Sequence, residues 1–163
     1  MKVSGLIFFS VLAVCFSSCN SKTAYNYSEK IVGIEKSIVP AMTKTEEDVG
    51  KYAQDANWDS VKVVSERMES LVEAKLVEIK KTPAPDVKEG ENFKRAAIDY
   101  FQYIEDIYTS YKNVAVQTTV EERQDATNKM MSTISNKGKA LADMQEAQKK
   151  FAKANGFTVE NQN

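Results

Sequence analysis

The sequence has no histidine and only two cysteines among its 163 residues. Without histidine, the chain lacks the most common general base and the most common metal ligand of proteins. Composition therefore excludes Ser/His/Asp and Cys/His catalysis, haem held by two histidines, and the Glu-x-x-His pairs of di-iron bundles. We expect no cofactor, no metal centre and no enzymatic activity.

The sequence also lacks an excess of charge of one sign. Lys and Arg number 22 against 23 Asp and Glu, a formal net charge of −1. No overall field therefore attracts nucleic acid, and we expect no nucleic-acid partner. With 42% hydrophobic and 28% charged residues, the chain has the composition of one ordinary globular domain.

Long apolar runs are missing except near the start of the chain. The run "LIFFSVLAVCF", Leu6 to Phe16, follows the basic residue Lys2. It is much shorter than the roughly 20 residues that a membrane-spanning helix needs. Residues 1–18 therefore predict a secretory signal peptide, and the chain after it has no predicted transmembrane helix.

The predicted signal peptide ends in "FSSC", Phe16 to Cys19. Ordinary signal peptidase sites have small residues at the last and third-last positions, so Phe16 argues against such a site. The motif resembles a bacterial lipobox, in which a cysteine receives diacylglycerol and the chain is cleaved just before it. Leucine is the usual third-last residue there, and phenylalanine resembles the looser lipobox of bacteroidete lipoproteins. The resemblance implies that Cys19 is lipidated and anchors the protein to a membrane.

The remaining chain shows helical periodicity. After a polar tether at 19–24, apolar residues recur every three or four positions in four segments. These segments are 25–53, 58–81, 93–114 and 119–156. They predict an all-α fold, an antiparallel up-down-up-down four-helix bundle over 25–156 with a tail at 157–163. No strand pattern competes with this prediction.

Several residues mark helix ends. Asn57 is a predicted N-cap, and Thr119 and Glu122 have the spacing of a capping box. Gly156 suits a left-handed C-cap, with Phe157 placed to fold back on the last turn.

Two positions have two interpretations each. Pro40 lacks a backbone N–H and crowds the preceding turn, so the first helix should kink or break near Val39. Gly138 lies where its stripe should face inward. It either lets a neighbouring helix approach closely or is a tolerated glycine.

Two acidic groups could bind calcium or act as acid and base. They are Glu46, Glu47 and Asp48, and Glu121, Glu122 and Asp125. Both lie where we expect the first turns of helices, and the helix dipole stabilises acids there. Neither has the glycine turn of a calcium loop. We therefore favour a structural interpretation of both groups.

The segment "DYFQYIEDIYTSY", from Asp99 to Tyr111, is rich in aromatic residues. Phe101, Ile104 and Tyr108 fit the core face of a helix. The candidate surface-recognition residues are Tyr100, Tyr103 and Tyr111. Tyrosine is common at interfaces, so a peptide, glycan or partner helix could dock there. Burial is the favoured interpretation of the aromatic stripe.

The motif "FSSCN" followed by four helical stripes resembles the small bacteroidete-type surface lipoproteins with a helical-bundle body, an uncharacterised family that supplies no activity or site residues. The resemblance implies an outer-membrane lipid anchor, with the periplasmic or surface face left open. We expect a non-enzymatic envelope lipoprotein that binds a protein, peptide or glycan or has a structural role.

Two alternatives remain open. A carrier of an apolar ligand between the helices would need an internal cavity of at least about 300 Å³. A carboxylate-based hydrolase, the less favoured alternative, would need two carboxylates about 5 to 9.5 Å apart.

Overall fold

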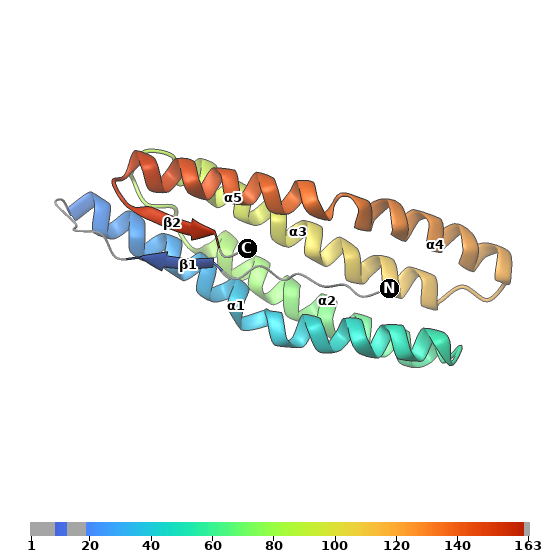
Figure 1. The fold of residues 1–163 in the computed structure, drawn as a ribbon. Coiled ribbons are helices and arrows are strands. Elements are labelled where there is room, and N and C mark those ends of the chain that lie inside the picture. Colours follow the sequence, from blue (N-terminus) through green and yellow to red (C-terminus); the bar gives the residue numbers. More distant parts are fainter. Residues whose placement is uncertain (1–8, 13–18, 162–163) are drawn as a thin grey trace.

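The computed structural model describes residues 9–12 and 19–161, and this part of the chain is mainly helical. Its helices are α1 (Cys19–Gln54), α2 (Trp58–Lys81), α3 (Gly90–Ala115), α4 (Val120–Ser135) and α5 (Lys137–Ala154), and its strands are β1 (Phe9–Leu12) and β2 (Thr158–Asn161). α4 and α5 follow one another in the same direction and together form the fourth rod of the bundle, and each rod runs antiparallel to the one before it (Figure 1). The predicted all-α class and four-helix bundle are confirmed.

The core is a continuous apolar cluster that α1, α2, α3 and α5 share. The largest buried side chains in it are Ile31, Ile38, Met68, Ile79, Phe93, Phe101, Ile104, Tyr108 and Phe151. Burying each such side chain stabilises the fold by about 1.5–3 kcal/mol. A smaller cluster of Val49, Val61 and Ala115 closes the end where α1 meets α2. The predicted core positions Phe101, Ile104 and Tyr108 are confirmed.

The predicted helix caps are present. The Asn57 side chain accepts a hydrogen bond from the backbone N–H of Ser60 at 3.2 Å. Thr119 and Glu122 form the capping box at the start of α4. Gly156 has a φ of +75°, the left-handed conformation that glycine adopts without strain. The next residue, Phe157, packs its ring 5.8 Å from the Phe151 ring.

Helix α1 is longer than predicted and unbroken. It begins at Cys19, so residues 19–24, expected as a tether, form its first turns. It also continues through Pro40, which excludes a split near Val39. Ile38 and Met42 on either side are buried in the core, and this packing stabilises the helix where one backbone hydrogen bond is missing.

The fourth rod, predicted as one helix over 119–156, is interrupted at Asn136. The Ser135 hydroxyl and the Asn136 amide both donate to the backbone carbonyl of Ser132, at 2.7 and 3.3 Å. Such bonds compete with the helical pattern. Gly138 follows, and a Cβ there would meet nothing within 4 Å. The close-approach interpretation of Gly138 is therefore wrong, and it is a tolerated glycine.

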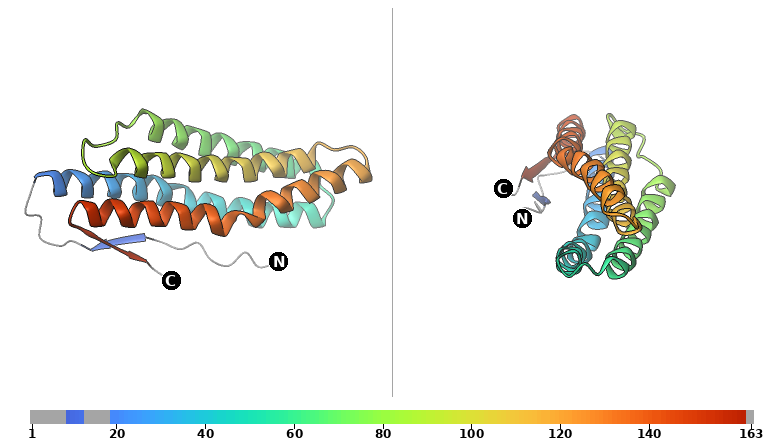
Figure 2. Two further views of the ribbon diagram at one scale, coloured as in Figure 1. Left: turned by 90° about the horizontal axis from the view of Figure 1, so that it is seen from above. Right: turned by 90° about the vertical axis from the view of Figure 1, so that its right-hand side faces the viewer.

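The two strands were not predicted. β1 and β2 pair antiparallel, with Phe9 opposite Asn161 and Leu12 opposite Thr158. The pair lies outside the helical bundle (Figures 1 and 2), and β2 is in contact with α5. Thus part of the predicted tail is a strand, and its partner comes from the predicted signal peptide; residues 1–8 and 13–18 of that peptide lie outside the described residues.

None of the helices in the described ranges is long and apolar enough to cross a membrane.

Candidate functional site

The three candidate surface tyrosines lie on α3, and the side chain of each contacts other residues of the same chain. The Tyr100 hydroxyl donates to the Glu35 carboxylate on α1 at 3.2 Å. Glu35 is only 9% exposed, and this burial raises its pKa to about 7, although the hydrogen bond from Tyr100 acts in the opposite direction. Burial, reinforced by the Glu35 charge, raises the pKa of Tyr100. The buried Glu35 and the half-buried Tyr100 therefore form a hydrogen-bonded ionisable pair.

Tyr103 forms hydrogen bonds at the junction between α4 and α5. Its hydroxyl donates to the backbone carbonyls of Thr133 and Ile134 at 3.1 and 3.3 Å. The backbone N–H of Asn136 also donates to these two carbonyls, so Tyr103 adds a second donor from α3 at the end of α4. Burial raises the pKa of Tyr103 to about 12.

Tyr111 packs against both core clusters. Its ring lies 6.0 Å from that of Tyr108, and burial raises its pKa to about 12. All three candidate tyrosines are therefore half-buried rather than exposed. Their role in surface recognition stays a prediction.

Tyr100 also reaches a surface hollow of about 230 Å³ beside the α4–α5 junction. The other residues that line it are Ala96, Asp99, Asn136, Lys139, Ala140 and Asp143. Lys139 and Asp143 form an ion pair at 2.5 Å across one turn of α5. The hollow thus combines an aromatic ring with charged groups.

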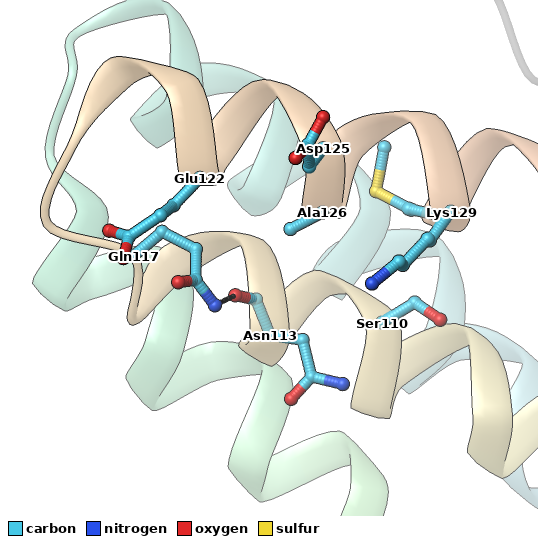
Figure 3. A pocket seen from close by; sticks show the side chains of 8 residues that line it. Ser110, Asn113, Gln117, Glu122, Asp125, Ala126 and Lys129 are labelled. Atoms are coloured by element: carbon cyan, nitrogen blue, oxygen red, sulfur yellow. Dashed lines mark hydrogen bonds between the residues drawn. The ribbon is translucent and has the colours of Figure 1, made fainter.

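A larger hollow of about 350 Å³ lies between α3 and α4 (Figure 3). Its lining residues are Ser110, Asn113, Gln117, Glu122, Asp125, Ala126, Lys129 and Met130. The Lys129 amino group extends toward Ser110, while the Gln117 amide donates to the Asn113 carbonyl at 2.9 Å. Six of the eight lining side chains carry a polar or charged group that a polar ligand could contact.

Glu122 at the edge of this hollow is held as an anion. Hydrogen bonds from the side chain and backbone of Thr119 lower the pKa of Glu122. A general acid requires a raised carboxyl pKa, so this group does not fit acid catalysis at neutral pH.

Trp58 lies at the end of the bundle where α4 begins. The Arg123 guanidinium lies 4.4 Å from the centre of the Trp58 ring, a cation–π contact that joins the starts of α4 and α2. Arg123 also donates to the Gln117 carbonyl.

The acidic groups have different structural roles. Glu121 and Glu122 are in the first turn of α4, as predicted, whereas Glu46, Glu47 and Asp48 lie well inside α1, so the first-turn explanation was wrong for them. Within residues 9–12 and 19–161, no three Asp, Glu or Cys side chains are grouped to hold a metal ion.

Sequence reasoning missed Glu35, the most buried carboxyl described here. A signal was present: Glu35 follows the buried Ser21 and Ser28 at seven-residue intervals along α1. A charged residue on an inward-facing line of small polar residues indicates a buried ionisable group.

No protein-family model, curated protein or solved structure matches this chain.

Proposed function

We propose that the protein is a lipid-anchored lipoprotein of the gram-negative outer membrane. On this proposal, its helical bundle binds another envelope component or has a structural role and carries out no catalysis. The observation that supports the proposal most is that Cys19, the predicted lipid-bearing residue, is the first residue of α1. The predicted cleavage point thus coincides with the start of the bundle.

Cleavage before Cys19 would keep both of the described core clusters. The members of both core clusters lie between Ala24 and Phe157, and Val159 packs against the larger cluster. The processed chain therefore keeps the apolar burial that stabilises the fold.

The anchor would also orient the bundle. α1 begins at one end of the bundle, and the α3–α4 connection is at the opposite end (Figure 1). A lipid on Cys19 would hold the first end at the membrane and present the polar hollow between α3 and α4 to the surroundings. Its amide, hydroxyl, ammonium and carboxylate groups suit a peptide or glycan.

The two alternatives have less support. The hollows at the α3–α4 and α4–α5 positions are open and lined largely by polar side chains, which does not favour an apolar-ligand carrier. The buried Glu35 and half-buried Glu46 lie on one helix, about 16 Å apart at 1.5 Å per residue. Paired catalytic carboxylates lie about 5 to 9.5 Å apart, so this arrangement does not favour a hydrolase.

Metabolic labelling with an alkyne fatty acid in the native host tests the anchor. We expect the label on the wild-type chain and on Cys15→Ala, because Cys15 lies inside the apolar leader run. Cys19→Ala should carry no label. An unlabelled wild type, or a Cys19→Ala chain that keeps its label, would contradict the proposal.

A further inference from the structure

Three surface hollows lie in a row between α3 and the fourth rod. Two of them are the hollow beside the α4–α5 junction and the hollow between α3 and α4. The third, of about 300 Å³, lies between the start of α3 and the middle of α5 and is lined by Glu89, Asn92, Asp143, Glu146, Ala147 and Lys150. It shares Asp143 with the hollow beside the junction, so these two hollows adjoin.

The spacing of the lining residues places the three hollows on one line, which we call the seam. The residues that α3 contributes include Asn92, Ala96, Asp99, Ser110, Asn113 and Gln117. Steps of three, four and eleven positions separate them, and each step returns to the same side of a helix. The seam therefore follows one face of α3 for about 38 Å, at 1.5 Å per residue.

Carboxylates outnumber cations along the seam. The lining side chains of the three hollows include six carboxylates and three lysine amino groups. Two of these lysines already form ion pairs with acids of α5, at 2.5 and 2.7 Å. Among the described residues, the exposed carboxylates of Asp99 and Asp125 have no hydrogen-bond or ion-pair partner. The seam thus has a net negative charge that attracts cationic groups.

The hollow beside the junction has the groups that hold a cationic side chain. Asp99 and Asp143 supply carboxylates, the second of them shared with Lys139, and Tyr100 supplies an aromatic ring. The Tyr100 hydroxyl donates to Glu35, a buried carboxylate that no Lys or Arg of residues 19–161 pairs with. Ammonium and guanidinium groups bind both carboxylates and aromatic faces. At about 230 Å³ the hollow is smaller than a typical ligand pocket and suits one side chain.

We propose that the seam binds an extended, basic segment of a partner polypeptide and that one Lys or Arg side chain of this segment occupies the hollow beside Tyr100. The inference rests on the proposed function and deepens its binding role. An extended chain rises about 3.3 Å per residue, so about 12 residues would cover the seam. The segment would pass over Tyr103, which joins α3 to the end of α4 within the seam.

The charge of the seam favours a basic polypeptide over a neutral glycan. A neutral glycan could form hydrogen bonds with the lining, but it would leave the excess of carboxylates without cations. Every second side chain of an extended polypeptide points to the same side, so a basic segment presents a row of cations to the seam. Such complementary charges give an interface its specificity.

The test uses the full protein as its native host processes it, purified in a non-ionic detergent. The probe is a fluorescent peptide of about 12 residues in which Lys alternates with Ser, and a matched peptide has Glu in place of Lys. Fluorescence anisotropy measures binding. We expect saturable binding of the Lys peptide, weaker at about 200 mM than at about 20 mM salt because salt screens exposed charges. The Glu peptide should not bind.

Variants of single carboxylates test the position of the peptide. Asp99→Asn should weaken binding of the Lys peptide by about fivefold, because it removes a charge that faces the bound cation. Asp99→Asn combined with Asp125→Asn should weaken it further, because these residues line two different hollows of the seam. Glu73→Gln is the matched control, since it removes the same charge from an exposed side chain on α2, and it should bind as the wild type does.

Equal binding of the Lys and Glu peptides, or equal effects of Asp99→Asn and Glu73→Gln, would overturn the proposal. Binding of a neutral maltohexaose that Asp99→Asn weakens, without binding of the Lys peptide, would assign the seam to a glycan instead. That result would overturn this inference and leave the binding role in the proposed function in place. The lipid anchor has its own readout, the fatty-acid label on Cys19, so the failure of either experiment is distinguishable from the failure of the other.

Discussion

The hydroxyl group of Tyr103 on α3 donates a hydrogen bond to the backbone carbonyl of Thr133, 3.1 Å away, in the last turn of α4. This contact is notable because α4 has no buried residue of its own. α4 packs mainly along α3, and so its position depends on a few specific contacts rather than on an apolar face.

Replacing Tyr103 by Phe should loosen the α4–α5 junction. The substitution removes only the hydroxyl and with it the hydrogen bonds from α3 to the two carbonyls, at a cost of about 1 kcal/mol in the free energy of unfolding. Amide hydrogen exchange in α4 should be faster than in the wild type. Tyr52→Phe is the matched control, since no hydrogen bond from its half-buried side chain is present. Equal exchange in both variants would contradict the role of Tyr103.

Arg123 should hold the start of α4 through its contact with Trp58. Arg123→Met removes the cation–π contact, worth about 0.5–1 kcal/mol at an exposed site, together with the bond to the Gln117 carbonyl. Trp58 is the single tryptophan, so its fluorescence reports the change directly. We expect altered emission and faster proteolysis within α4. Lys129→Met, an exposed change on the same helix, should leave the emission unchanged.

The Ser28–Gln148 bond should show strong coupling in a double-mutant cycle. Ser28→Ala leaves the buried Gln148 amide without its partner and should cost about 1–3 kcal/mol. Gln148→Met leaves the buried hydroxyl unpaired in the same way. The double variant removes both polar groups and should be less destabilised than the sum of the two single changes. Additive costs in urea unfolding would show that the pair is not coupled.

Glu35 should make the protein less stable as the pH rises. Its pKa is about 7 in the folded chain against a reference value of 4.5. Below 4.5 the carboxyl is protonated in both folded and unfolded chains, so it carries no pH-dependent cost. As the pH rises from 4.5 to about 7, only the unfolded chain ionises and stability falls. Above that range the cost is constant, about 3 kcal/mol.

The Glu35→Gln variant tests this dependence, because glutamine has no charge and can still accept the Tyr100 hydrogen bond. Its gain in unfolding free energy over the wild type should be larger at about pH 8.5 than at about pH 5. Glu73→Gln, an exposed change on α2, should show no such pH dependence. A Glu35→Gln gain that is the same at both pH values would contradict a raised pKa for Glu35.

Much of the bundle follows from local sequence signals. Apolar spacing placed Phe101, Ile104 and Tyr108 in the core, and short-range chemistry identified the caps at Asn57 and Thr119. These features depend on residues within a turn or two of one another, so the sequence carries them directly.

Features that depend on distant segments were not predictable in this way. The pairing of β1 with β2 joins the two ends of the chain, and neither four-residue strand has an alternating pattern strong enough to indicate it. The interruption at Asn136 arises from competing side-chain bonds to Ser132, for which apolar spacing gives no sign. The partner of Glu35, Tyr100, comes from another helix, so no pattern within α1 identifies it.

The central claim is that Cys19 carries the lipid anchor, and mass spectrometry of the protein from its native host tests it most directly. We expect an N-terminal peptide that begins at Cys19 and carries a diacylglyceryl-sized adduct on its sulfur. An unmodified Cys19, or a chain that still begins with residues of the apolar leader, would contradict the account.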